Sequence, residues 1–173
     1  MFPANNCSNQ ERLFMADDSK FTELECHRKF AASIFNDIWR LLGQPSRTSD
    51  EDEEMLAASY ASCYHWRKVG TSLNQARGEW MISHVNVILG RGQAALHHAK
   101  RSLTICLENS YGDFDLAYAY EGLARAQAAA GDKKGFAANL KLASEAGEKI
   151  AGKEDRELFL NDLTSGPWFS MRD

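Results

Sequence analysis

The chain has 173 residues, of which 44% are hydrophobic and 25% charged, with three prolines and a formal net charge of -4 at pH 7. This length and composition fit one globular domain and exclude a disordered or fibrous chain. The acidic balance argues against nucleic acid and anionic membranes as partners, because both favour strongly basic surfaces.

Targeting and membrane signals are not evident. No window approaches the roughly 18 apolar residues of a membrane-spanning helix, and residues 1–20 lack the basic start and apolar run of a secretory signal. Those residues also show no sustained hydrophobic period, so we expect a loosely attached arm followed by a single helical domain over 21–173. The four cysteines show no paired spacing, which predicts reduced thiols in a cytoplasmic protein.

Apolar residues recur at intervals of three and four from Thr22 to Leu42, which predicts a first helix ending at Gly43. Thr48 and Glu51 match a capping box that opens a second helix, which runs to about Val69. Five more helices are expected at about 72–89, 93–108, 113–130, 133–150 and 154–163.

Small polar residues and glycines mark the predicted helix ends. Ser72 with Gln75 is expected to cap the third helix. Gly112 and Asp113 are expected to place a C-cap directly before an N-cap. Links this short force neighbouring helices to run antiparallel. Because no segment shows the alternation of a strand, the fold class is predicted as all-α with about seven helices.

Two of these helix pairs are related by an internal sequence repeat. The segment GRGQAALHHAKRSLTI at 90–105 aligns with GDKKGFAANLKLASEA at 131–146, an offset of about 41 residues. The preceding helices also end alike, as SHVNVILG and ARAQAAAG. The pattern resembles the tetratricopeptide repeat, with small or apolar positions at Gly90, Ala95, Ala99 and Ser102 in one unit and Gly131, Phe136, Leu140 and Ala143 in the next.

The run over 76–132 is similar to a set of uncharacterised bacterial tetratricopeptide-like proteins, from which no activity carries over. The resemblance implies a right-handed stack of antiparallel helix hairpins, clearest over 72–110 and 113–150. The family's usual unit is about 34 residues, so this chain departs from it in length.

The inner helices of such a stack line a concave groove. If 72–89 and 113–130 are the inner helices, positions about four apart on the groove face are Arg77, Trp80 and His84 in the first and Tyr118, Glu121 and Arg125 in the second. Trp, Tyr and Arg dominate binding energy at interfaces. The alternative is that the aromatic side chains belong to the core and the arginines are solvated.

We therefore expect a non-enzymatic module that captures a protein or peptide segment, with Trp80 and Tyr118 as apolar anchors and Arg77 and Arg125 binding carboxylates. An acidic partner segment would suit the locally basic stretch His65–Arg101, whose only acidic residue is Glu79. A structural homodimer without a groove ligand is the alternative.

Catalytic and metal signatures are weak. His97 and His98 lie about 100° apart around a helix and cannot chelate one metal without further ligands. Cys106 lies two helical turns from His98, too far for a nucleophile and base to pair directly. We expect no cofactor, no metal and no catalytic residue. An enzyme built around His97, His98 and Asp113 is the third hypothesis.

Overall fold

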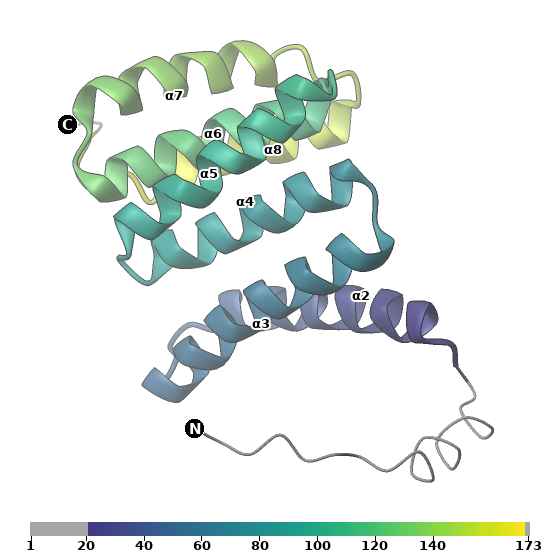
Figure 1. Ribbon diagram of the computed structural model, residues 1–173. Coiled ribbons are helices and arrows are strands. Elements are labelled where there is room, and N and C mark those ends of the chain that lie inside the picture. Colours follow the sequence, from purple (N-terminus) through teal and green to yellow (C-terminus); the bar gives the residue numbers. More distant parts are fainter. Residues whose placement is uncertain (1–20, 172–173) are drawn as a thin grey trace, which may run out of the picture.

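The computed structural model describes residues 21–171, and within them it contains seven α-helices and no strand (Figure 1). The helices are α2 (Glu23–Leu42), α3 (Ser49–Val69), α4 (Ser72–Ile88), α5 (Gly92–Glu108), α6 (Asp113–Ala130), α7 (Lys133–Gly147) and α8 (Lys153–Ser165). The predicted all-α class is confirmed. The arm predicted over residues 1–20 lies outside the described residues.

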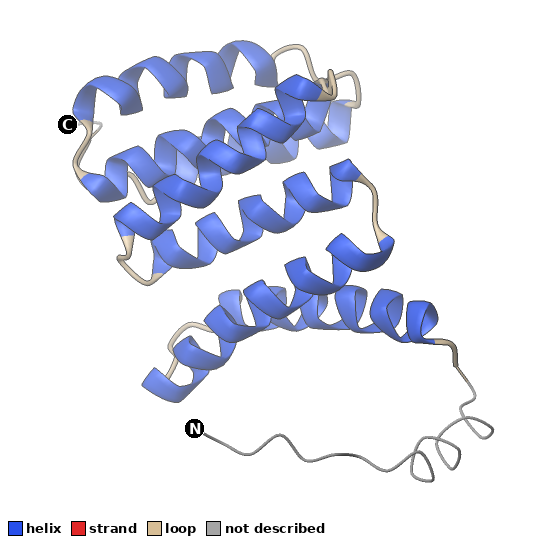
Figure 2. Ribbon diagram, in the orientation of Figure 1, coloured by secondary structure: helices blue, strands red, loops and turns tan. Residues whose placement is uncertain are grey.

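Consecutive helices pack in pairs, α2 with α3, α4 with α5 and α6 with α7, and the pairs follow one another as layers (Figures 1 and 2). The last helix, α8, packs on α6 and α7. Helix α4 also packs directly on α6, whereas no Cα atom of α2 lies within 8 Å of one in α4. Side chains therefore bridge the space between α2 and α4. Among helices α2–α8, none is both long and apolar enough to cross a membrane.

The N-cap residue observed for α3 is the predicted one, whereas the N-cap residue of α4 is not. In α3 the Thr48 N–H donates to Glu51 Oε2 at 2.7 Å, and the Glu51 N–H donates to Thr48 Oγ1 at 3.2 Å, which confirms the predicted capping box. The prediction for α4 is wrong by one residue, because Thr71 is the N-cap. The predicted cap, Ser72, instead hydrogen-bonds through its Oγ to Tyr111 Oη at 2.6 Å.

The prediction at the α5–α6 link is also wrong. Ser110 and Asp113 are left-handed, with φ of 56° and 53°, and Gly112 is the N-cap of α6 rather than a C-cap. Asp113 is the first helical residue, and its carboxylate accepts a hydrogen bond from the Ala151 N–H at 3.0 Å. Asp113 thus connects the start of α6 to the link before α8.

The two glycine turns of the repeat have the same geometry. Gly90 and Gly131 are both left-handed, with φ of 69° and 79°. In each turn the residue after the glycine donates to a carbonyl five positions earlier, at 2.8 Å and 2.9 Å, and the glycine donates to one three positions earlier, at 3.0 Å and 3.1 Å. This is the Schellman pattern, in which only glycine is free of strain at the left-handed position.

Small residues let the helices approach closely at two crossings. A Cβ atom on Gly78 would lie 3.0 Å from Cys63 Sγ, where α4 crosses α3. A Cβ atom on Gly122 would lie 2.8 Å from Trp80 Cδ1, where α6 crosses α4. The Trp80 indole can lie against α6 because position 122 has no side chain.

Candidate functional site

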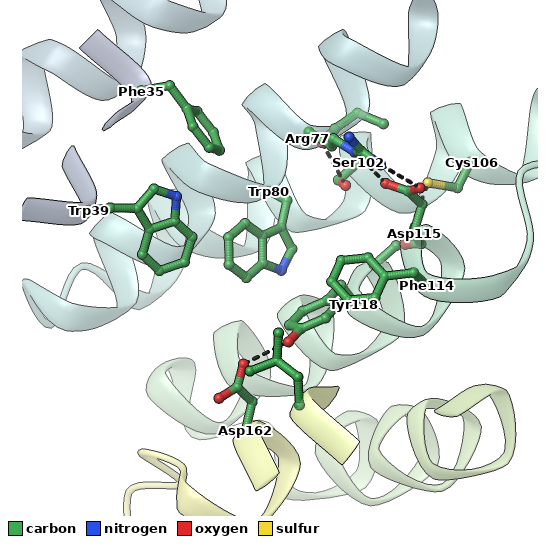
Figure 3. Close-up of a pocket in the computed structure, with 13 residues that line it drawn as sticks. Phe35, Trp39, Arg77, Trp80, Ser102, Cys106, Phe114, Asp115, Tyr118 and Asp162 are labelled. Atoms are coloured by element: carbon green, nitrogen blue, oxygen red, sulfur yellow. Dashed lines mark hydrogen bonds and ion pairs between the residues drawn. The ribbon is translucent and has the colours of Figure 1, made fainter. Parts of the chain in front are cut away.

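A cavity of about 520 Å³ opens on the face formed by α2, α4, α6 and α8 (Figure 3). It lies where α2 and α4 stand apart, with α5 contributing Ser102 and Cys106. Most of its wall is aromatic or aliphatic, formed by Phe35, Trp39, Trp80, Phe114, Tyr118 and Leu158. Its size and apolar lining are typical of binding pockets, which have roughly 300–1,000 Å³.

The aromatic side chains form a connected row across the cavity wall. The Trp39 ring on α2 lies 6.1 Å from the Trp80 ring on α4, and Trp80 meets Tyr118 on α6 edge-on at 5.6 Å. Phe114 lies 4.6 Å from Tyr118, one turn earlier on α6. The row spans the space between the α2 and α4 backbones, and these side chains form the wall of the cavity there.

One ion pair lies in the cavity wall. Arg77 on α4 donates to both carboxylate oxygens of Asp115 on α6, from Nε at 2.6 Å and from Nη2 at 3.0 Å. The hydrogen bonds from this bidentate pair raise the pKa of Arg77 further above its ordinary value. Arg77 therefore lines the cavity with its charge already paired within the chain.

A second polar contact connects α6 to α8. The Tyr118 hydroxyl donates to Asp162 Oδ2 at 2.6 Å. Burial raises the pKa of Tyr118, and the neighbouring Asp162 carboxylate raises it further. Tyr118 thus remains a neutral phenol and a hydrogen-bond donor at physiological pH.

Three of the six predicted groove residues line this cavity, namely Arg77, Trp80 and Tyr118. His84 lies behind the wall, with its ring stacked on Trp80 at 4.9 Å and 13°. Burial lowers the pKa of His84 to about 3, and the positive charge of Arg125 contributes. His84 is therefore a neutral packing residue and does not face the cavity.

Glu121 and Arg125 do not face the cavity either, and both are buried. The Arg125 guanidinium donates to the Glu121 carboxylate and to the backbone carbonyls of Asp162 and Gly166. Its Cζ atom lies 4.9 Å from the ring centroid of Trp168. Arg125 thus attaches the end of α8 to α6, an attachment that no local sequence signal indicates.

The rest of the cavity wall was not identified from the sequence. Phe35 and Trp39 lie on α2, and Leu158 and Asp162 lie on α8. Each pair is four residues apart, the spacing of one helix face. The spacing alone could not show that α2 and α8 flank the same opening, because that depends on how the pairs stack.

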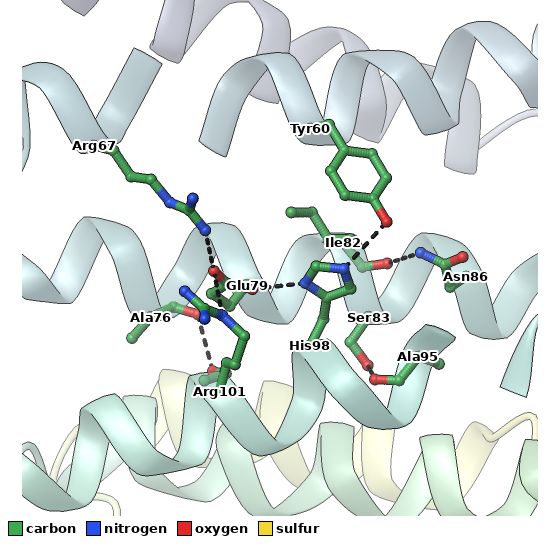
Figure 4. A network of polar contacts seen from close by, with 11 residues as sticks. Tyr60, Arg67, Ala76, Glu79, Ile82, Ser83, Asn86, Ala95, His98 and Arg101 are labelled. Atoms are coloured by element: carbon green, nitrogen blue, oxygen red, sulfur yellow. Dashed lines mark hydrogen bonds and ion pairs between the residues drawn. The ribbon is translucent and has the colours of Figure 1, made fainter. Parts of the chain in front are cut away.

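The basic stretch His65–Arg101 is divided among separate ion pairs rather than gathered on one surface. Arg67 and Arg101 both donate to Oε1 of Glu79, at 2.5 Å and 2.9 Å (Figure 4). Arg91 pairs with Glu53 at 2.6 Å. Together with the Arg77 pair, these contacts engage four of the six Arg and Lys side chains of the stretch.

Glu79 is almost fully buried at the centre of a polar network that also includes His98. His98 Nδ1 lies 2.7 Å from Glu79 Oε2, and His98 Nε2 lies 3.1 Å from the Tyr60 hydroxyl (Figure 4). Burial by itself would raise the pKa of Glu79, but hydrogen bonds from His98, Arg101 and Arg67 lower it to about 2. The network joins α3, α4 and α5.

Cys106, the one thiol in the cavity wall, is poorly suited to act as a nucleophile. Burial raises the pKa of Cys106 to about 11, and the Asp115 carboxylate adds to the effect. Among residues 21–171, no three His, Cys, Asp or Glu side chains are grouped so as to hold a metal ion. The described Cys26, Cys63 and Cys106 are free thiols.

Comparisons of the chain with protein-family models, with curated proteins and with solved structures gave no match.

Proposed function

We propose that the chain is a tetratricopeptide-like stack that acts as a non-enzymatic interaction module. In this proposal a segment of a partner protein docks on the face formed by α2, α4, α6 and α8, and an anchor side chain enters the cavity. The paired layers of helices and the equivalent turns at Gly90 and Gly131 support the tetratricopeptide-like interpretation.

The observation that carries the proposal is the row of aromatic side chains at the mouth of an open cavity. Aromatic residues dominate the energy of protein interfaces because they bury a large area while losing little conformational entropy. Trp39 is 46% exposed although its ring contacts Trp80. An incoming side chain would cover this exposed apolar area.

A binding role fits the chemistry of the wall better than catalysis. Cys106 and Tyr118 have raised pKa values and keep their protons at neutral pH, and the Ser102 hydroxyl donates to the Ala76 carbonyl at 2.9 Å. Arg77 and Asp115 satisfy each other. The free thiols also favour a reducing compartment, and we place the protein in the cytoplasm on that ground.

The structure removes the reason to expect an acidic partner. The acidic-segment hypothesis required Arg77 and Arg125 to be free to bind carboxylates. Arg77 is paired with Asp115, and Arg125 is buried with Glu121. We therefore drop the requirement for an acidic partner and keep the proposal of a docked segment.

Selection from a random peptide display library tests the proposal. We expect the wild-type chain to enrich a family of segments whose binding falls at least about tenfold in Trp39→Ala. Loss of an aromatic side chain that dominates an interface costs about 2 kcal/mol or more. Leu107→Ala is the matched control, because Leu107 is 55% exposed on α5 and does not line the cavity. Segments that bind Trp39→Ala as well as the wild type would contradict the proposal.

The homodimer hypothesis is tested with the same preparations. Light scattering gives the mass in solution, and a dimer that Trp39→Ala converts to monomer would mean that a second copy occupies the face. A monomeric wild type that enriches no segment would refute both hypotheses.

A further inference from the structure

The cavity wall has one carboxylate without a cationic partner. Asp162 accepts a hydrogen bond from Tyr118 at Oδ2, and its carboxylate takes part in no ion pair within residues 21–171. Arg125 is near, but it donates to the backbone carbonyl of Asp162, at 2.9 Å, and not to the side chain. Arg77, the cation of the cavity wall, is paired with Asp115 through Nε and Nη2.

Among residues 21–171, no other cationic side chain forms an ion pair with Asp162. Burial keeps His84, behind Trp80, neutral at physiological pH. Arg125 contacts Glu121 through Nε, and neither of these two residues lines the cavity. Asp162 Oδ1 remains available at the α8 side of the opening (Figure 3).

The rest of the wall suits a cation that carries apolar groups. Aromatic rings attract alkylammonium groups through the negative charge of their faces, and Trp is the most effective ring. Trp39, Trp80, Tyr118 and Phe114 lie in one row, and Asp162 on α8 lies below it, beside Tyr118 (Figure 3). Aromatic walls with a carboxylate at the edge match an ammonium group on an aliphatic stem.

We propose that the cavity binds an alkylammonium group, the side chain of lysine or of N-methylated lysine, as the anchor of the docked segment. The aliphatic stem contacts Leu158 and the aromatic wall, and the ammonium group lies between the rings and Asp162. This inference rests on the proposed docking function and specifies the chemistry of its anchor.

The test uses the full chain and a matched pair of probes. Choline carries a trimethylammonium group, and its carbon analogue carries a tert-butyl group of nearly the same shape without the charge. Binding is followed through the indole N–H resonances of Trp39 and Trp80 in an NMR titration. We expect choline to bind saturably, and the carbon analogue to bind roughly tenfold more weakly because it lacks the charge.

Asp162→Asn removes the proposed counter-charge with little change in shape. We expect it to weaken choline binding roughly fivefold to tenfold and to leave the carbon analogue unaffected. Glu157→Gln is the control, since it removes one negative charge from the exposed face of α8. Should Asp162→Asn fail to fold, Tyr118→Phe keeps the carboxylate and frees its second oxygen, so choline affinity should stay the same or rise.

Three results would overturn the proposal: equal binding of the two probes, no choline binding, or choline binding that is unchanged in folded Asp162→Asn. If Asp162→Asn does not fold, weaker choline binding in Tyr118→Phe would overturn it instead. None of these decides the docking function. If the display library yields cavity-dependent segments with apolar rather than basic anchors, the docking function stands and this inference fails. If it yields no cavity-dependent segment while choline binds as expected, the docking function fails.

Discussion

Replacing Glu79 by glutamine tests how much the buried carboxylate shared by Arg67, Arg101 and His98 stabilises the fold. The carboxylate is 1% exposed and accepts from Arg67, Arg101 and His98, which lie on α3 and α5. The variant keeps the size of the side chain and removes its charge. Two half-exposed arginines would then face a neutral amide instead of their shared counter-ion.

The expected magnitude follows from the pKa of Glu79. The pKa falls from 4.5 to about 2 on folding. Because each unit of pKa corresponds to about 1.4 kcal/mol, the ionised form contributes roughly 3 kcal/mol of stability at pH 7. The folded pKa is depressed, so this contribution is complete above pH 4.5 and is lost as the pH falls toward 2. About 2 kcal/mol of it should be gone by pH 3.

Urea unfolding followed by circular dichroism at several pH values between 7 and 3 measures this contribution. The wild type should exceed Glu79→Gln by about 3 kcal/mol at pH 7, and the gap should shrink as the pH falls. Glu108→Gln, which changes an exposed acid on α5, is the control and should stay within about 0.5 kcal/mol of the wild type. A gap that does not change between pH 7 and pH 3 would refute the reasoning, because the network would then not depend on an ionised Glu79.

Three further predictions concern buried positions behind the cavity wall. Gly122→Ala places a methyl group against the neighbouring indole and should destabilise the chain by about 1–3 kcal/mol in urea unfolding, whereas Gly112→Ala meets no atom within 4 Å and should change stability by less than about 1 kcal/mol. Arg125→Met strands a buried carboxylate and releases the end of α8, so it should cost about 3–5 kcal/mol, against less than about 1 kcal/mol for Arg91→Met at an exposed ion pair. The His84 imidazole should show no NMR titration between pH 8 and pH 5. Because burial depresses its pKa to about 3, its neutral form is favoured on folding, and this contribution to stability is lost below about pH 6.5.

Much of the candidate site depended on information outside the local sequence. The sequence grouped Arg77, Trp80 and Tyr118, all of which line the cavity, because residues three or four apart on a helix share a face. It could not separate them from His84, Glu121 and Arg125, which lie on the same helices but are covered. Whether a helical side chain is free or covered depends on the neighbouring helix, and Trp168 and the end of α8 cover Arg125.

The outer side of α2 gives a further example. Leu24 and Phe30 fit the apolar period of that helix, yet they are 62% and 49% exposed. Helix α2 is the terminal described layer, so within residues 21–171 no further helix covers this side (Figure 1). Periodicity predicts which residues could be buried together, and the stacking decides which of them are.

The sequence by itself determined the all-α class, the approximate limits of all seven described helices and the equivalence of the turns at Gly90 and Gly131. These features depend on hydrophobic period, capping residues and the left-handed conformation of glycine, all of which act within a few residues of one another. Only the tertiary structure decided that α2 stands apart from α4 and that α8 closes the opposite side. It also decided which charges cancel, because Arg77 and Asp115 lie 38 residues apart in the chain and become partners only when the layers stack.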